Sequence, residues 1–141
     1  MFHLIKNANV FAPQAMGLCH VLVVAEKIIY IGAHEPVLDD IFDVEVVDLA
    51  GASLVPGLID GHAHITGGGG ETGPASRVPP VFLSQFTHSG VTSVVGVLGT
   101  DDLTRNTQSI VTQAYSLREE GMSAWCHTGA VSYTHLTLPT I

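Results

Sequence analysis

Basic residues are scarce in this chain, and their scarcity bears on its partners. Lysine and arginine together number 5 among 141 residues, against 13 aspartates and glutamates, so the net charge is −8 with neutral histidines. Binding to nucleic acid or to an anionic membrane surface depends on clusters of positive charge. The composition therefore argues against both kinds of partner.

Cysteine and long apolar runs are also scarce. Cys19 and Cys126 are isolated and lack C-x-x-C spacing, so we expect reduced thiols rather than a disulfide. No apolar stretch reaches the ~18 residues that a membrane-spanning helix needs. The first residues lack a basic segment followed by a long apolar core, which is the pattern of a secretory signal. We therefore expect a cytoplasmic protein.

A His-x-His motif is the most informative feature that is present. His62 and His64 end an apolar, strand-like segment that begins at Pro56, and four glycines follow at 67–70. Residues two apart on a strand point the same way, so both imidazoles can face one point in space. Neutral imidazole is a common zinc ligand. A lone His-x-His is more often an exposed pair in a loop, but the preceding strand and the following glycines favour a metal site.

Three segments together resemble a known family. The run Pro-Gly-Leu-Ile-Asp-Gly-His-Ala-His at 56–64 is similar to the signature of the amidohydrolase superfamily. Within that superfamily, the segments Gly67–Pro74 and Gly90–Asp101 resemble isoaspartyl dipeptidases, and the resemblance extends from about Phe2 to Ala130. It implies an α/β fold with a metal-dependent hydrolase (β/α)₈ barrel of the TIM type. Such barrels carry their chemistry at the C-terminal ends of their strands.

The resemblance also implies a division of the chain. Residues 1–54 would form part of a small β-sandwich, in agreement with their short β-branched runs. Residues 55–130 would form about two and a half β/α units, which is too little for a closed barrel of roughly 250 residues. Residues 131–141 depart from the family pattern, and we interpret them as a non-native tail from sequencing-adapter read-through.

Local patterns predict the elements of the middle segment. Pro79–Pro80 can open a helix with Phe82, Leu83 and Phe86 on one face. Val91–Val97 is typical of a strand buried on both sides. Asp101 or Asp102 can cap a second helix, in which Ile110, Ala114 and Leu117 recur at helical spacing, and 122–126 would be the next strand.

The resemblance assigns substrate contacts to the glycine-rich segment. Glu71 would bind the free α-amino group of a small dipeptide, assisted by Gly69, Gly70 and Thr100. A carboxylate facing an ammonium makes a charge-assisted hydrogen bond. His62 and His64 would bind one of two zinc ions. The remaining ligands, and the aspartate that handles the proton, would lie on later strands, so no catalytic residue is assigned here. Asp60 is expected to be structural.

Three functional hypotheses remain open. The first is the N-terminal part of a zinc-dependent isoaspartyl dipeptidase, whose parent protein would be a homo-oligomer. The second is a cyclic amidase of the dihydroorotase or hydantoinase type, whose substrates lack the free ammonium that Glu71 would bind. The third is a truncated chain that has no turnover as it stands.

Overall fold

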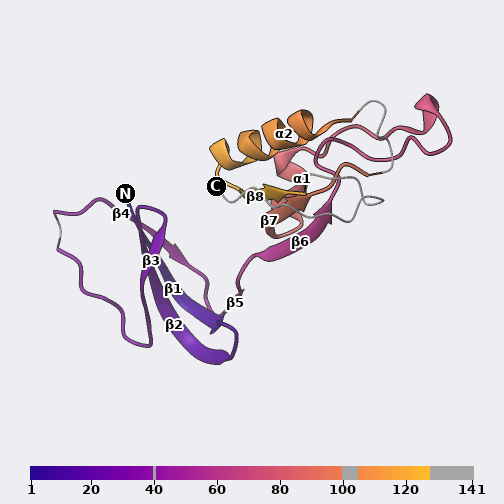
Figure 1. The fold of residues 1–141 in the computed structure, drawn as a ribbon. Helices are drawn as coiled ribbons and strands as arrows, with labels where there is room; N and C mark the ends of the chain where they lie inside the picture. The colour runs from indigo at the N-terminus through magenta and orange to yellow at the C-terminus, as the bar shows by residue number, and fades with distance from the viewer. Residues whose placement is uncertain (40, 100–104, 128–141) are drawn as a thin grey trace. The chain divides into compact units, whose positions relative to one another are not determined.

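The chain forms two compact units, and its secondary structure taken as a whole is mixed α/β. The computed structural model describes residues 1–39, 41–99 and 105–127. The division falls between Pro56 and Gly57 (Figure 1). The mixed α/β class expected from the sequence is confirmed, whereas the domain assignments 1–54, 55–130 and 131–141 remain predictions.

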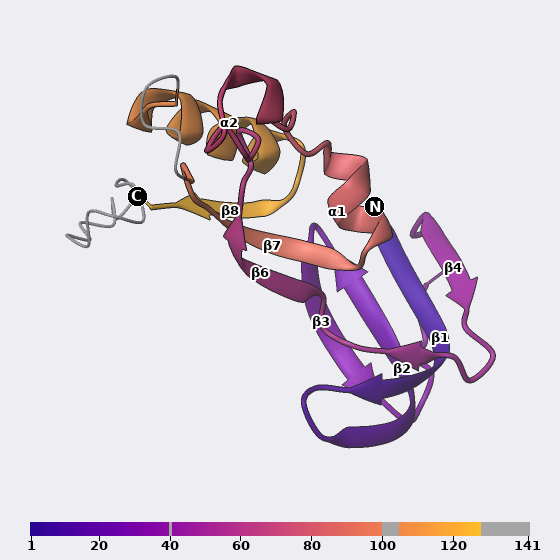
Figure 2. The same ribbon diagram turned by 90° about the vertical axis from the view of Figure 1, so that its right-hand side faces the viewer.

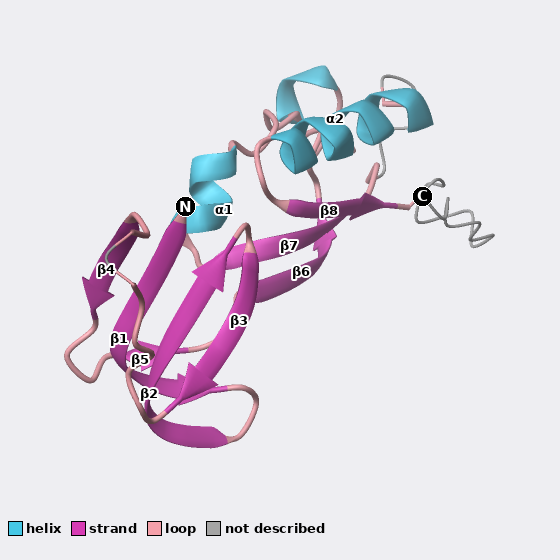
Figure 3. Ribbon diagram, turned by 90° about the vertical axis from the view of Figure 1, so that its left-hand side faces the viewer, coloured by secondary structure: helices cyan, strands magenta, loops and turns pink. Residues whose placement is uncertain are grey.

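The first unit is a single sheet of five strands. They are β1 (Phe2–Phe11), β2 (Ala15–Val24), β3 (Lys27–Gly32), β4 (Val44–Asp48) and β5 (Ser53–Leu54). The order is β3-β2-β1-β4, with β5 also paired to β1 (Figure 3). Neighbours β1, β2 and β3 are antiparallel, while β4 and β5 run parallel to β1. Its core is formed by Ala8, Val10, Cys19 and Val21.

A carboxylate organises the turn after β4. The Asp48 side chain accepts hydrogen bonds from the backbone N–H of Ala50 at 2.8 Å and from the Asn7 amide at 2.9 and 3.0 Å. These bonds favour the ionised form, so the Ala50 N–H first and the Asn7 amide second lower the pKa of Asp48. The turn therefore depends on the charged carboxylate.

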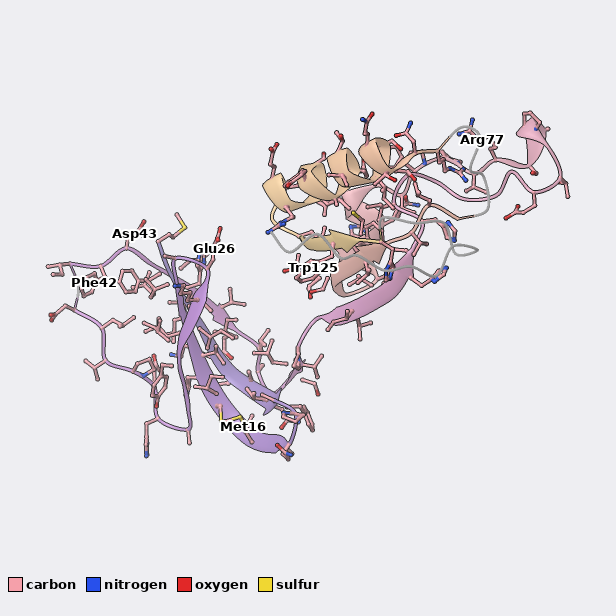
Figure 4. The ribbon with its side chains drawn as sticks, viewed as in Figure 1. Met16, Glu26, Phe42, Asp43, Arg77 and Trp125 are labelled. Atoms are coloured by element: carbon pink, nitrogen blue, oxygen red, sulfur yellow. The ribbon has the colours of Figure 1, made fainter. Side chains whose placement is uncertain are left out.

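The second unit alternates strand and helix. It contains β6 (Leu58–Ala63), a 3₁₀ helix (Pro74–Ser76), α1 (Leu83–His88), β7 (Val91–Gly96), α2 (Thr107–Glu119) and β8 (Ser123–Cys126). The three strands are parallel in the order β6-β7-β8 (Figure 2). Val94, Ala124 and Cys126 are buried with α1 and α2 residues in one core. On the other side of β8, Trp125 is 51% exposed (Figure 4).

The helices agree in part with the sequence patterns. In α2 the predicted face is confirmed, since Ile110, Ala114 and Leu117 are buried. Its N-cap is Asn106, whose side chain accepts from the Ser109 N–H at 2.9 Å, while the expected caps at 101 and 102 lie outside the described residues.

The first helix begins later than the sequence predicts. It starts at Leu83, and Phe82 is an extended N-cap residue that is 73% exposed. Pro79 precedes another proline and is thereby biased to extended backbone, which delays the helix. The Phe82 N–H is bonded to the Gln85 side chain at 2.9 Å, and this contact fixes the start. No helix in the described ranges is long and apolar enough to cross a membrane.

Candidate metal and substrate site

The His-x-His motif lies at a bulge of β6. Asp60 pairs with Val94 and Ala63 with Gly96, so three steps on β6 oppose two on β7. Such a bulge re-aims the side chains around it. The Asp60 carboxylate accepts a hydrogen bond from the His62 N–H at 3.0 Å and holds the bulge in place. This contact supports the structural role expected for Asp60.

A tight turn orients His64 directly after the strand. The Ala63 carbonyl accepts hydrogen bonds from the Val97 N–H at 2.9 Å and from the Ile65 N–H at 3.0 Å. The His64 carbonyl accepts from the Gly67 N–H at 2.9 Å. Ile65 is completely buried and anchors the turn in the core. The two histidines therefore converge through a bulge and a turn, not through strand alternation alone.

The imidazoles are close enough to share a metal ion. Their ring centroids are 5.5 Å apart with an interplanar angle of 65°. Two imidazoles bound to one tetrahedral zinc through bonds of about 2.0–2.1 Å have centroids roughly 5 Å apart. The separation of the two rings therefore matches that of a pair bound to one zinc ion. No third histidine, cysteine or carboxylate joins them among the described residues, so this chain offers two ligands in the ranges described.

His64 is held in a cradle of two glycines. A Cβ added to Gly68 would lie 3.6 Å from the His64 ring, and one added to Gly99 only 2.7–2.8 Å from it. Gly99 also has a left-handed φ of +77°. Within the described ranges, the buried Nδ1 of His64 has no hydrogen-bond partner. A ring that is fixed while one nitrogen still needs a partner suits a ligand position.

The glycine-rich segment forms a closed loop rather than a flexible linker. Gly68 and Val78 exchange two backbone hydrogen bonds, at 3.2 and 2.9 Å, which close its base. Within the loop, the Gly70 N–H donates to the Ser76 hydroxyl at 3.2 Å. A Cβ on Gly69, whose φ is +67°, would clash with the Ser76 carbonyl oxygen. The loop 67–78 extends away from β6–β8 (Figure 1).

The predicted substrate contacts lie on this loop or beyond the described residues. Glu71 is exposed and directly follows the glycines. The Gly70 N–H is bonded to Ser76, so a substrate contact there would use another Gly70 atom or replace that bond. Thr100 lies outside the described residues. The assignments of Gly69, Gly70, Glu71 and Thr100 remain predictions.

The structure brings Arg105 next to the site, although no sequence motif predicts a role for it. Its guanidinium donates to the carbonyls of Gly68 at 2.7 Å and Gly69 at 3.0 Å. It is 4% exposed, and no other charged residue among those described is buried. A single arginine outside any motif carries no local signal of such a role.

The cysteines behave as ordinary core residues. Cys19 and Cys126 are both buried and free, and they lie in different units. Burial raises the pKa of the Cys126 thiol. Neither thiol takes part in the geometry around the histidines.

Comparison with known proteins shows which enzymes this geometry resembles. No family model matches the chain. The enamidase of Eubacterium barkeri is 32% identical over 74 residues, which are 52% of this chain and 18% of that protein. The dihydropyrimidinase structure from Brevibacillus agri is 25% identical, with a TM-score of 0.58, over 90% of this chain and 27% of that one. In fold and site, the chain is similar to proteins of the amidohydrolase superfamily.

A narrower likeness covers nearly the whole chain. The β-aspartyl dipeptidase of Fervidobacterium islandicum AW-1 is 42% identical, with a TM-score of 0.81, over 92% of this chain and 35% of that one. Its complex with the β-Asp-Leu dipeptide is 41% identical, with a TM-score of 0.80, over 99% and 36%. The resemblance stated from the sequence is confirmed by these structures. The chain spans about a third of their length.

Proposed function

We propose that this chain is the N-terminal part of a metal-dependent hydrolase that cleaves isoaspartyl (β-aspartyl) dipeptides. The observation that carries the proposal is the 41–42% identity to a β-aspartyl dipeptidase over 92–99% of this chain. The ordered histidine pair at the end of β6 supports it. The three parallel strands would be the first of a (β/α)₈ barrel, and the first unit would be part of a β-sandwich.

His62 and His64 would hold one zinc ion of the complete site. When bound, zinc lowers the pKa of a coordinated water to near 7 and polarises the substrate carbonyl. The two residues of this chain contribute position: the bulge fixes His62 and the glycine cradle fixes His64. The other ligands and the proton-transferring aspartate would come from a longer parent protein. We therefore expect the 141-residue chain alone to show no turnover.

Glu71 would select substrates with a free amino terminus. It is the carboxylate that directly follows the glycines, and it is exposed. An ammonium bound by a carboxylate gains a charge-assisted hydrogen bond. The Gly69 carbonyl already accepts from Arg105, so a substrate ammonium bound there would share that oxygen with the guanidinium.

The proposal is tested with a hybrid enzyme. Residues 1–127 of this chain are joined to the part of the Fervidobacterium enzyme that follows the position matched to residue 127. We expect the hybrid to contain zinc and to hydrolyse β-Asp-Leu, and His62→Ala to lose zinc and activity together. A folded, zinc-loaded hybrid without activity on β-Asp-Leu contradicts the proposal.

A cyclic amidase is the second candidate, and the similarity to a dihydropyrimidinase favours it. Ring-opening of dihydrouracil or hydantoin by the same hybrid, without cleavage of β-Asp-Leu, would support it. Cyclic amides carry no free ammonium, so Glu71→Gln would leave that activity unchanged. Loss of cyclic amidase activity in this variant would count against the second candidate.

A further inference from the structure

We propose that Arg105 is a positioning residue, which locks the base of loop 67–78 against the segment that leads into α2. The inference rests on the proposed function, since it assigns to Arg105 the placement of the loop that carries Glu71. Arg105 lies 36 and 37 residues from the two glycines that it contacts. It therefore joins parts of the second unit that local sequence does not connect.

The contacts form a fork. Nη2 donates to the Gly68 carbonyl at 2.7 Å and Nη1 to the Gly69 carbonyl at 3.0 Å. A planar guanidinium can satisfy two adjacent acceptors at once, whereas an ammonium is a point donor. Two fixed carbonyls in succession determine the backbone direction at the start of the loop. Lysine cannot reproduce that constraint.

The same carbonyl links the fork to the closure of the loop. The Gly68 oxygen accepts both from Arg105 and from the Val78 N–H, the latter at 2.9 Å. The guanidinium thus holds the first residue of the pair that closes the base. Loss of the two Arg105 hydrogen bonds should weaken the hydrogen bond of the Val78 N–H. It should not disturb the core beneath α2, where Ile110 and Leu117 are buried.

The fork also borders the histidine cradle. Arg105 Nη1 lies 4.0 Å from the position of a Cβ on Gly99, the glycine that packs on His64. The residue therefore touches the glycine loop and lies beside the support of a proposed metal ligand. A buried cation at this junction costs desolvation, which two carbonyl acceptors offset.

Amide hydrogen exchange on the 141-residue chain tests the proposal. Arg105→Met should speed exchange at the Val78 N–H about tenfold or more, the scale of a hydrogen bond to a charged group. Arg105→Lys should give an intermediate rate. Amides of α2, such as Ala114, should keep their rates. Arg118→Met is the matched control, because Arg118 is an exposed arginine of α2 and should change nothing in the loop.

Two results would overturn the inference. The first is wild-type exchange at Val78 in Arg105→Met. The second is faster exchange throughout α2 and the strands, which indicates a general structural role. If Arg105→Met does not fold, Arg105→Lys decides: selective exchange at the loop supports positioning, and either of the two results above refutes it.

A kinetic arm in the hybrid enzyme separates this inference from the proposed function. With zinc content unchanged, Arg105→Lys should raise KM for β-Asp-Leu several-fold and leave kcat near wild type. An unchanged KM would overturn the positioning role. A wild-type hybrid without activity would count against the proposed function only, because the exchange measurement still decides the role of Arg105.

Discussion

The packing of Gly99 on His64 gives the sharpest prediction. In Gly99→Ala, the new methyl group would lie 2.7 Å from Cε1 and 2.8 Å from Nδ1 of His64. Carbon atoms in favourable contact are about 3.5–4.0 Å apart, so the ring must retreat by roughly 0.8 Å. Metal–ligand distances tolerate only about 0.2 Å. We therefore expect zinc affinity of the hybrid enzyme to fall about 10–100-fold, the effect of disturbing a ligand's support.

The same substitution should reduce stability through two terms. Alanine with a left-handed φ costs about 1–2 kcal/mol. Overpacking against a fixed ring costs about 1–3 kcal/mol more. The sum is about 2–5 kcal/mol, measured as the free energy of unfolding in urea. Zinc content is measured by elemental analysis after dialysis against zinc buffers of graded concentration.

Two other glycines separate the terms. Gly68→Ala faces the same ring at 3.6 Å, an ordinary contact, and should bind zinc like the wild type. Gly121→Ala has a φ of +96° with nothing within 4 Å of its Cβ, so it should lose about 1–2 kcal/mol and keep its zinc affinity. If Gly99→Ala binds zinc as tightly as Gly68→Ala, the geometry proposed for His64 is wrong.

Four further predictions concern other groups. Glu71→Gln in the hybrid should lower kcat/KM for β-Asp-Leu roughly ten- to a hundredfold with zinc content unchanged, since a hydrogen bond to a charged group contributes about 1.5–3 kcal/mol. If the wild type and the variant reject an N-acetylated substrate equally, Glu71 does not bind the substrate's amino group. His62→Ala should lose zinc, measured by elemental analysis, and retention of zinc would contradict its assignment as a ligand. Because hydrogen bonds lower the pKa of Asp48, its contribution to the stability of the first unit is present above about pH 4 and is lost as the pH falls through the folded-state pKa. Between pH 6 and pH 3, the free energy of unfolding in urea should therefore fall less for Asp48→Asn than for the wild type, and an equal fall in both would contradict the lowered pKa. Because burial raises the pKa of Cys126, its alkylation by iodoacetamide at pH 8, followed by mass spectrometry, should be slower in the folded chain than in urea, and equal rates would refute the shift.

Sequence patterns predicted the elements whose signal is local. The apolar run at 91–97 became β7, and the spacing of Ile110, Ala114 and Leu117 became the buried face of α2. The His-x-His pair was predicted because two identical ligands two residues apart are a short-range signal. The prediction that the two imidazoles converge rested on an incomplete reason. Alternation of side chains along a regular strand takes no account of the bulge between Asp60 and Ala63 or of the turn at His64.

What the sequence did not predict depends on contacts between distant residues. The contacts of Arg105 require that the segment before α2 lie next to Gly68 and Gly69, and no pattern around residue 105 encodes those partners. The partner of the Gly70 N–H is Ser76, whose hydroxyl reaches it only after the loop has closed. The helix start at Leu83 was missed because two consecutive prolines favour extended backbone more than they favour a first helical turn.

The closed base of the loop has a consequence for how this protein can diverge. The Gly68–Val78 pair holds the two ends of the loop together whatever lies between them. The residues of the tip, including Glu71 and the 3₁₀ helix at Pro74–Ser76, can therefore change in length and chemistry while β6 and its histidines stay in place. The tip of such a loop can be replaced without altering the strand that precedes it. A lineage could exchange the tip to acquire a new substrate, and the inherited metal ligands would need no compensating substitution.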